Sequence, residues 1–529
     1  MKGDPLKASY DAVVIGSGHN GLVAAAYLAG AGKSVLVLER NADFGGATAS
    51  KKVFPDYDAY LSTYSYLVSL FPQKIVHDLG LNFALKRRRT ASFTAYNDPN
   101  GVAKGLVLSN VDAGRSQLSM RELTGSDAAW TDYERLLELE QCVAEHVWPG
   151  LLEPLRSKQT FESSMASPLE KEAWRSFVEE PLGKVIERYA ADDALRGLLL
   201  TDGKIGVFAD AHDPTLIQNR CFLYHIVGGG DGEWHVPVGG MRSLVNSLID
   251  VCLGSGVDFL SSAEVKSVGL GGDHHEVTFE HEGELESVAA EHVLVNAGPK
   301  TFASLLGEPW EPSAENEGSV IKINMLLKRL PKVRASGVTS EEAFGGTFHI
   351  DEGYTQMQRS YEQASRGIIP NPAPGEIYCH TLTDPSILSP ELQAAGYQTL
   401  TLFGLDMPYR LFESDHNARR EAVLKLYLEG LDRICDEPFL DCVAVDSKGQ
   451  PCIEIKTPQD LEREVDLDQG NIFHNAPSWF FAKDASEVGT WGVETGYPRV
   501  YRAGSSALRG GAVSGIPGHN AAMSVLAQS

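Results

Sequence analysis

The segment that follows Tyr10 constrains the fold of this chain more than any other. A short apolar run at 11–15 leads directly into GSGHNG at 16–21, which is a GxGxxG motif. An Ala- and Leu-rich segment at 22–29 and a second apolar run at 34–38 follow it. The order of strand, glycine loop, helix and strand predicts the βαβ unit of a dinucleotide-binding domain.

Residues of the glycine loop have distinct physical roles in holding a nucleotide. Gly16 permits a tight turn, Gly18 lets a pyrophosphate approach the backbone, and Gly21 lets the helix pack closely on the strand. His19 and Asn20 stand in the loop just before the predicted helix, whose N-terminus offers free N–H groups and a positive dipole end to the phosphates. We therefore expect all five residues at the cofactor.

The residues after the second run extend this predicted site. Glu39 stands where a carboxylate can accept hydrogen bonds from ribose hydroxyls, and Arg40 follows it. Gly45-Gly46 forms a second glycine turn whose N–H groups can reach the same phosphates or ribose. The first motif does not distinguish FAD from NAD. The added turn resembles the two-dinucleotide-fold flavoproteins, which include amine oxidases and carotenoid desaturases, and this resemblance implies FAD.

The end of the chain predicts a second contact with the same cofactor. A run at 499–503 is typical of a strand and enters a turn at Gly504. A glycine-rich loop with Gly511 and Val513 then precedes a final helix that includes 521–527 and starts near Pro517. In the flavoprotein group the chain returns to the flavin at this point. The resemblance thus implies that Gly504, Gly511 and Val513 bind the cofactor, with the positive end of the helix toward the flavin pyrimidine.

Several short motifs resemble one branch of these flavoproteins over nearly the whole chain. They are VIGSGHNGL at 14–22, PVGGM at 237–241, KIN at 322–324, TPQDLE at 457–462 and GNIFH at 470–474. These blocks are similar to those of the phytoene desaturase-like FAD oxidoreductases, the carotenoid desaturase and ketolase branch. Within it, the likeness is greatest to the group of pyridine nucleotide-disulfide oxidoreductase domain-containing protein 2. The resemblance implies an FAD-dependent oxidoreductase.

Two positions depart from the patterns of these relatives. Leu508-Arg509 stands where they commonly carry His-Pro. The permanent cation of Arg509 suits a substrate anion or the flavin, whereas a polyene has no anion to meet it. Ala47 follows the second glycine turn, where amine oxidases usually have an arginine, and this counts against the amine-oxidase branch.

The predicted fold class is α/β: a Rossmann-like, two-dinucleotide-fold FAD domain with an interleaved α+β substrate domain. We expect the FAD domain to be discontinuous, with pieces at 1–91, 234–304 and 487–529. Short strand-like runs between 256 and 295 are expected to hold the adenine. In this group the backbone of a valine such as Val265 often makes that contact.

The substrate domain is expected to consist of 92–233 and 305–486, with a helical insertion in the first piece. A Ser126-Asp127 cap and apolar residues at helical spacing predict a helix there, with Tyr133 and Leu137 among its core residues. The basic run Lys86-Arg87-Arg88-Arg89 is interpreted as a solvated strand end. The alternative is a contact for an acidic substrate or membrane headgroups at the site entrance.

Histidines are the candidates for a catalytic base. Hydride transfer to flavin N5 needs geometry more than a dedicated residue, so a base helps only when the substrate has a proton to lose. His235 precedes the PVGGM turn, and His474 and His519 lie in family-like blocks, so these three are the catalytic candidates. His225 and His380 are further candidates, and a structural role is the alternative for each.

Charge and composition limit the partners. The chain has 46 Lys and Arg against 71 Asp and Glu, for a net charge of −25, which argues against nucleic acid. No apolar run reaches the length of a membrane span, and the polar start does not resemble a secretory signal. We therefore expect a cytoplasmic protein, with peripheral membrane contact as an alternative. Seven scattered cysteines predict neither a metal site nor disulfides.

The combined prediction is an FAD-dependent dehydrogenase or desaturase that removes a hydride from a small, largely apolar organic substrate. Oxygen, a quinone or another acceptor would reoxidise the flavin. Alternatives within enzymes are a carotenoid-type ketolase, a non-redox isomerase and an amine oxidase. The non-enzyme alternative is a prenyl-binding protein like the GDP-dissociation inhibitors, which the Gly45-Gly46 pair and the C-terminal glycine block argue against.

Overall fold

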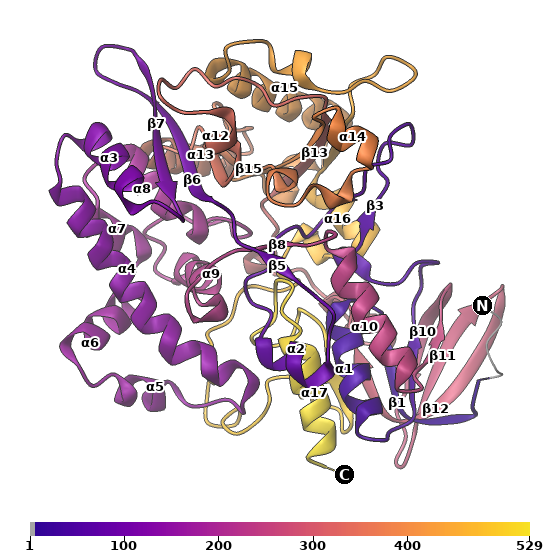
Figure 1. The fold of residues 1–529 in the computed structure, drawn as a ribbon. Coiled ribbons are helices and arrows are strands. Elements are labelled where there is room, and N and C mark those ends of the chain that lie inside the picture. Colours follow the sequence, from indigo (N-terminus) through magenta and orange to yellow (C-terminus); the bar gives the residue numbers. More distant parts are fainter. Residues whose placement is uncertain (1–5, 529) are drawn as a thin grey trace.

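A computed structural model describes residues 6–528 and organises them around two sheets (Figure 1). Residues 1–5 and 529 lie outside the described part. The first and last residues of the predicted FAD domain lie outside the described part, as do residues 1–5 of the polar N-terminal stretch.

The first sheet has a parallel centre. β1 (Ser9–Ile15) pairs in parallel with β2 (Val35–Leu38) on one side and with the end of β12 (Glu284–Val295) on the other. β9 (Asp258–Leu260) continues the sheet beyond β2, and β18 (Val500–Arg502) pairs with β12. Strands from the beginning, the middle and the end of the chain therefore share one sheet.

An antiparallel extension lengthens the same sheet beyond β12. It consists of β10 (Ala263–Gly269) and β11 (His275–His281), so the strand order is β10-β11-β12-β1-β2-β9. The strand-like runs expected between 256 and 295 form these elements.

Three helices pack on one face of this sheet: α1 (His19–Gly30), α10 (Arg242–Gly254) and α17 (Ile516–Leu526). Successive residues of β1 point to opposite faces, so Val14 packs with these helices while Val13 packs with residues of the antiparallel extension. Both residues are fully buried, which explains why β1 is apolar throughout.

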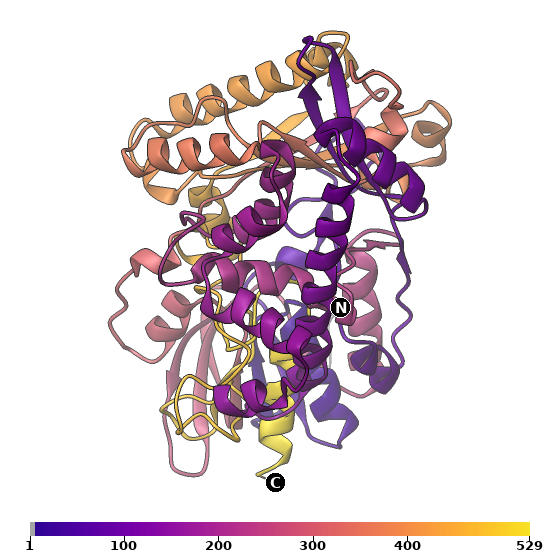
Figure 2. The ribbon, with the colours of Figure 1, turned by 90° about the vertical axis from the view of Figure 1, so that its left-hand side faces the viewer.

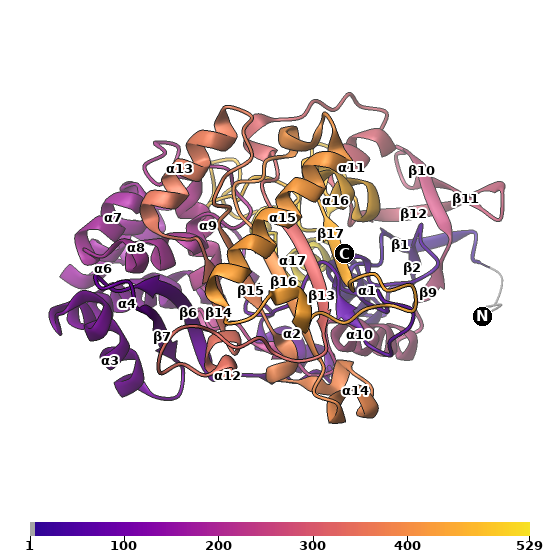
Figure 3. The ribbon, with the colours of Figure 1, turned by 90° about the horizontal axis from the view of Figure 1, so that it is seen from above.

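The second sheet has the order β17-β13-β16-β15-β14-β6-β7 and is antiparallel except where β14 meets β6. α15 (His416–Ile434) lies across one face of it (Figure 3). The strands are β6 (Thr90–Asn97), β7 (Ala103–Ser109), β13 (Ile321–Leu327), β14 (Thr347–Ile350), β15 (Gly375–Tyr378), β16 (Gln398–Gly404) and β17 (Ile453–Lys456).

A layer of helices extends from the second sheet down alongside the first, and Figure 2 looks onto it. Their apolar side chains share one buried core, and the helix expected after Ser126-Asp127 is α4. The helices are α3 (Ala113–Thr124), α4 (Ala128–Val147), α5 (Lys158–Ser164), α6 (Pro168–Trp174), α7 (Leu182–Tyr189), α8 (Asp193–Leu200) and α9 (Ile217–Ile226).

The remaining elements are short or connect these layers. Within residues 6–528, no helix combines the length and the apolar character needed to cross a membrane. The connecting elements are β3 (Ser50–Lys51), β4 (Leu61–Ser62), β5 (Leu85–Lys86), β8 (Val236–Pro237), α2 (Gln73–Leu79), α11 (Pro299–Leu305), α12 (Ser340–Phe344), α13 (Tyr354–Ser365), α14 (Pro390–Ala394) and α16 (Pro458–Val465).

The packing of α17 on α1 can be tested at a glycine. A Cβ atom added to Gly518 would lie 2.0 Å from the carbonyl oxygen of Asn20, whereas a Cβ on Gly30 would meet nothing within 4 Å. Gly518→Ala is expected to lower the free energy of unfolding by about 1–3 kcal/mol, because the two helices must separate. Gly30→Ala is expected to leave it unchanged or to raise it by up to about 1 kcal/mol. Urea unfolding measures both, and equal effects would contradict this close packing.

Candidate functional site

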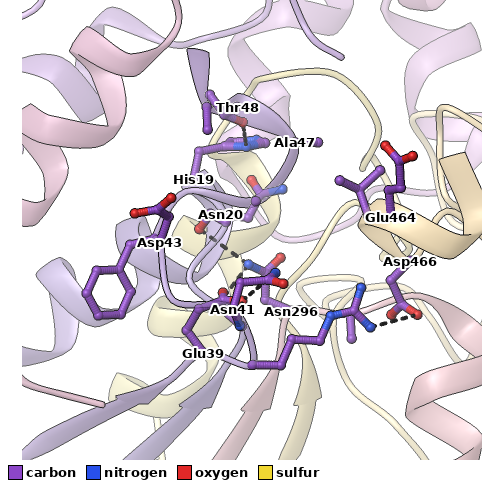
Figure 4. Close-up of a pocket in the computed structure, with 18 of the residues that line it drawn as sticks. His19, Asn20, Glu39, Asn41, Asp43, Ala47, Thr48, Asn296, Glu464 and Asp466 are labelled. Carbon is purple, nitrogen blue, oxygen red and sulfur yellow. Dashed lines mark hydrogen bonds and ion pairs between the residues drawn. The ribbon is translucent and has the colours of Figure 1, made fainter. Parts of the chain in front are cut away.

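A groove of about 1080 Å³ opens where β1 and β2 end (Figure 4). Ile15 and Leu38, the last residues of the two strands, line it together with the loops that follow them. The carboxyl ends of parallel strands are where open α/β sheets bind their ligands. The groove is therefore the candidate cofactor site.

The first glycine loop has no room for side chains. Gly16 has φ +94°, and a Cβ there would lie 2.6 Å from the carbonyl oxygen of Asn296. A Cβ on Gly21 would lie 2.3 Å from the carbonyl oxygen of Gly16, and one on Gly18 3.0 Å from Asn296 Nδ2. The loop thus presents bare backbone, and the start of α1, to the groove.

The second glycine loop packs directly on the first. Gly45 forms a parallel bridge with Gly18, and its N–H donates to Ser17 Oγ at 3.2 Å. A Cβ on Gly46 would lie 3.4 Å from Gly18 Cα. The two loops therefore form one continuous backbone surface.

Glu39 is buried at the end of β2 and is held by the protein itself. Its Oε2 accepts hydrogen bonds from the N–H of Ser17 (3.0 Å) and from Ser17 Oγ (2.6 Å). Its Oε1 accepts from the N–H of Asn41 (2.9 Å) and from Asn41 Nδ2 (3.0 Å). These four donors fix the carboxylate in one orientation. A ribose hydroxyl could take the place of the Asn41 side-chain amide as a donor to Oε1.

Buried polar atoms on the groove walls lack hydrogen-bond partners. Asn20 Oδ1 and His474 Nδ1 have none among the described residues, although both side chains line the groove. His19 Nδ1 lies 2.8 Å from Thr48 Oγ1. Burial lowers the pKa of His19 to about 3 and that of His474 to about 4. At neutral pH these rings offer hydrogen bonds without charge, which fits a polar ligand between them.

Residues that follow α16 form the opposite wall of the groove (Figure 4). Asp466 Oδ1 lies 3.8 Å from Arg40 Nη1 and accepts a hydrogen bond from Thr301 Oγ1 at 2.8 Å. Its Oδ2 accepts from the N–H of Gly298 at 3.2 Å. These contacts attach the second sheet's domain to the strand ends that carry the glycine loops.

The structure places most predicted cofactor residues at this groove. Gly21 and Gly45 lie behind its lining, Gly504 packs against Asn296, Gly511 lies against Tyr224 and Phe473, and Val513 is part of the core around α17. The predicted residues that line the groove are Gly16, Gly18, His19, Asn20, Glu39, Arg40, Gly46, Val265 and His474.

Three other predicted site residues lie elsewhere. His519 is buried between the rings of Tyr27 and Trp491, at centroid distances of 5.1 and 6.1 Å. Arg509 is buried too, and its guanidinium donates to the carbonyl oxygens of residues 150 (2.8 Å), 153 (2.9 Å) and 491 (3.1 Å). His235 lies beside Glu233 at 3.6 Å, near the surface. None of the three lines the groove, and Arg509 has a structural role because backbone carbonyls occupy it.

A second cavity of about 400 Å³, which we call the chamber, lies between the second sheet and the helical layer. Tyr133 and Leu137 of α4 line it. Tyr133 also packs against the helical core as predicted, whereas Leu137 is 39% exposed, so the core prediction was wrong for Leu137. The other walls combine aromatic rings with polar groups. They include Tyr66, Arg88, Ser92, Glu140, Asp202, His225, Trp234, His349, Glu376 and Tyr378.

Strand alternation explains the polar floor of the chamber. Ile377 of β15 packs in the core under α15, whereas Glu376 and Tyr378 on either side of it face the chamber. The hydroxyl groups of Tyr378 and Tyr66 both donate to Glu376 Oε1, the latter at 3.4 Å. Burial, with the negative charge of Glu352 added, raises the pKa of Glu376 well above its usual range.

His349, on β14, lies beside a buried carboxylate. Its Nδ1 is 2.6 Å from Glu352 Oε2, which also accepts a hydrogen bond from Thr201 Oγ1 at 2.5 Å. A carboxylate in this position orients the ring and favours the tautomer with a proton on Nδ1. Nε2 is then the proton acceptor of a ring that lines the chamber.

The basic run at 86–89 is only partly a solvated strand end. Lys86 pairs with Asp384 at 2.8 Å and Arg87 pairs with Glu233, and both cations remain about half exposed. Arg88 instead is buried and lines the chamber, where it donates to the carbonyl oxygen of residue 234 (3.2 Å) and to Thr347 Oγ1 (3.1 Å). The interpretation was wrong for Arg88, because the chain here passes between the two sheets.

Two short segments, 65–66 and 473–474, lie between the groove and the chamber. The N–H and Oγ of Ser65 donate to the carbonyl oxygen of Ala47, which lines the groove, at 3.3 and 2.8 Å, while Tyr66 lines the chamber. His474 lines the groove, and the ring of Phe473 lies 6.2 Å from that of His225 in the chamber. A single layer of residues therefore divides the two cavities.

Lys322 lies fully buried in this dividing layer. Its Nζ donates to the carbonyl oxygens of Ser62 (3.0 Å) and Tyr64 (2.5 Å) and lies 4.8 Å from the centre of the Tyr66 ring. Burial lowers its pKa well below the usual range of a lysine. The KIN block was noticed in the sequence for its family likeness, without this position being foreseen.

Comparison with other sequences identifies relatives along the full chain. Residues 14–83 match the NAD(P)-binding Rossmann-like domain. Over 525 residues the chain is 42% identical to the uncharacterized protein Rv0897c of Mycobacterium tuberculosis, covering 98% of this chain and 97% of that one. The chain belongs to the same family as Rv0897c. It is also 28% identical to pyridine nucleotide-disulfide oxidoreductase domain-containing protein 2 of Rattus norvegicus, over 98% and 93% of the two chains. The relationship predicted from the sequence motifs is thereby confirmed.

Solved structures show the same fold. A putrescine oxidase in complex with putrescine superposes with a TM-score of 0.55 at 16% identity, over 98% of this chain and 99% of that one. The predicted α/β class with a Rossmann-like domain is confirmed, and the chain shares its overall fold with this oxidase. The narrower phytoene desaturase-like assignment stays a prediction.

FAD is the cofactor that this fold and groove fit. The bare glycine loops and the start of α1 suit a diphosphate, and the fixed carboxylate of Glu39 suits a ribose. The unpartnered atoms of Asn20 and His474 suit polar edges of the same ligand. The volume of the groove suits a ligand larger than most single substrates.

Cofactor retention tests the role of Glu39. Glu39→Gln keeps the shape of the side chain. Its amide N–H₂ group, however, would face hydrogen-bond donors that in the natural protein donate to the carboxylate. We expect FAD affinity to fall at least about tenfold, since hydrogen bonds to a charged group are lost. Asp43→Asn, on the same groove, is the control with little expected effect. Fluorescence titration of flavin-free protein with FAD measures both, and equal affinities for the two variants would refute the assignment.

The pH dependence of stability tests the chamber. Burial and the nearby Asp202 raise the pKa of Glu140 to about 8, from 4.5. The folded state thus holds this proton more tightly than the unfolded chain does. Its contribution to stability is complete below about pH 4.5 and is lost as the pH rises toward about 8. Glu140→Gln should therefore flatten the fall in unfolding free energy over this range.

The matched control for that measurement is Glu134→Gln, at an exposed position of the same helix. Urea unfolding at several pH values should give this variant the slope of the natural protein. Indistinguishable slopes for all three proteins would contradict the buried, protonated state of Glu140.

Proposed function

We propose that this protein is an FAD-dependent dehydrogenase that oxidises a small organic substrate held in the chamber. One observation carries the proposal: the cofactor groove and the chamber lie on the two sides of a single layer of residues, 65–66 and 473–474. A ligand in the chamber and a dinucleotide in the groove would approach each other across this layer. Hydride transfer requires reacting atoms about 3–3.5 Å apart, so a bound flavin ring would have to extend through this layer into contact with the substrate.

FAD, when bound, supplies an isoalloxazine ring that accepts the hydride. The chain's own residues hold the nucleotide through Glu39 and the glycine loops, and they enclose the substrate between the second sheet and α4. A substrate that loses a hydride must also lose a proton when a double bond forms. His349, oriented by Glu352, is the residue in the chamber best arranged to accept that proton.

The reaction also needs an electron acceptor and a substrate that fits the chamber. The two electrons leave to oxygen, a quinone or another acceptor, which restores the oxidised cofactor. Tyr66, Tyr133 and Trp234 offer apolar surface for the carbon skeleton of a largely apolar substrate, as a desaturase requires. The free, scattered thiols of the described residues suit a reducing compartment and support a cytoplasmic location. The polar groove and its fixed carboxylate argue against a prenyl-binding protein without flavin.

Anaerobic reduction of the bound flavin tests the proposal. Holoprotein mixed with candidate substrates should lose absorbance near 450 nm, and dithionite should produce the same change. His349→Gln should slow reduction by the substrate at least about tenfold without changing the flavin content, because the proton acceptor is lost. His274→Gln, on an exposed loop, is the control. Reduction of the His349 variant at the natural rate would exclude this residue as the base.

A further inference from the structure

We propose that the chamber recognises the positively charged nitrogen of an amine-bearing substrate. This inference rests on the proposed function, since it takes the chamber to be the substrate site. It narrows the substrate class from a largely apolar molecule to one that carries an ammonium group on an apolar skeleton.

The walls of the chamber carry more acidic side chains than basic ones. Glu140 from α4, Asp202 after α8 and Glu376 from β15 all line it, and none of them has an ion pair within 4 Å in the described part of the chain. Arg88 is the only Lys or Arg on the described walls, and it donates hydrogen bonds to two neutral oxygens, the carbonyl of residue 234 and Thr347 Oγ1. The three carboxyl groups are therefore left without a cationic partner among the described residues.

The other acidic groups at the chamber are already occupied. Glu233 pairs with Arg87 and lies near His235. Asp231 accepts a hydrogen bond from the N–H of Glu233 at 3.0 Å. This leaves Glu140, Asp202 and Glu376 as the carboxyl groups with which an added cation would interact.

Independent of these carboxyl groups, a buried hydroxyl also points to a ligand. Ser92, on β6, is 7% exposed and lines the chamber, but its Oγ has no hydrogen-bond partner within residues 6–528. Buried hydroxyl groups are normally paired, so this atom is suited to a donor from outside the chain. An ammonium group has three donors and no acceptor, which matches an environment of oxygen atoms.

Aromatic rings complete the environment. Tyr66, Tyr133, Trp234 and Tyr378 line the same chamber as the three carboxyl groups. Ring faces attract cations, and the combination of aromatic rings and carboxylates is typical of ammonium recognition. A volume of about 400 Å³ suits a small organic molecule.

Two of the three carboxyl groups have raised pKa values. Burial and Asp202 raise the pKa of Glu140, and burial and Glu352 raise that of Glu376. His349 and His225 line the same chamber, and His349 Nδ1 lies 2.6 Å from Glu352 Oε2. An ammonium group would favour the ionised carboxylates, so its binding should release protons to the solvent.

A metal ion and a neutral ligand fit the chamber less well. No group of three or more potential metal ligands occurs in the described residues. A neutral apolar ligand would remove water from the carboxyl groups without replacing its hydrogen bonds, and this is unfavourable. An organic cation avoids both difficulties.

Calorimetric titration of the full chain with straight-chain primary amines, and with alcohols of the same length, tests the inference. Anaerobic solution and prior reduction with dithionite prevent turnover of the amine. We expect at least one amine to bind about tenfold more tightly than its alcohol. The binding heat should also differ between buffers of different ionisation enthalpy, because protons are released.

Glu376→Gln and Glu140→Gln should each weaken amine binding about tenfold and change alcohol binding by less than about twofold. Glu376→Gln keeps an acceptor for Tyr378, so its folding is expected to be preserved, and Glu134→Gln should match the natural protein. Equal affinities for amines and alcohols, or equal losses for both in the variants, would overturn the inference. If amines bind as expected but no substrate reduces the flavin, recognition stands and the proposed reaction fails.

Discussion

The contact between Asn296 and the first glycine loop determines how the rest of the structure is arranged. Asn296 follows β12, and its side-chain amide donates to the carbonyl oxygens of Gly16 (3.1 Å) and Gly18 (3.3 Å). Its backbone N–H donates to the carbonyl oxygen of Ile15 at 2.8 Å. Gly504, after β18, packs on the same residue. Three distant segments thus meet at one residue, and Gly16, Gly18 and Gly504 leave the space that Asn296 occupies.

The position of Asn296 determines where the groove and the chamber lie. Because the strand ends converge at Asn296, the groove opens there and the glycine loops form one of its walls. The second sheet is attached across the groove through Asp466, so its polar face is turned toward the first domain. Lys322 and Glu376 lie on that face, at the layer between the cavities and in the chamber. The position of the chamber therefore follows from the geometry of the cofactor site.

Local patterns were sufficient to predict the Rossmann-like fold of the nucleotide half of the molecule. The GxGxxG loop, Glu39 and the second glycine turn are contiguous, and each has a physical role that depends on near neighbours. The chamber was not predicted, because its residues come from separate strands and helices. Its signal in the sequence was weak: polar residues alternate with apolar ones in otherwise buried strands, as at His349 and Glu376. Long-range pairing decides whether such residues face a cavity or solvent.

Isolated charged and titratable residues were the least predictable. Arg509 departs from the family pattern, yet it holds backbone carbonyls of the segment after α4. His519 lies in a family-like block but packs between aromatic rings. Arg88 belongs to a charge run and is nevertheless buried. In each case the partner is distant in the sequence, so residue type and spacing could not indicate the role.

The central claim is that the two glycine loops and Asn296 form a site for FAD. The most direct measurement is mass spectrometry of the nucleotide released when the purified protein is denatured, together with its amount per chain. The account predicts FAD at about one molecule per chain, as expected for one groove of this kind. A nicotinamide dinucleotide, or protein that neither contains FAD nor binds it when FAD is added, would contradict it.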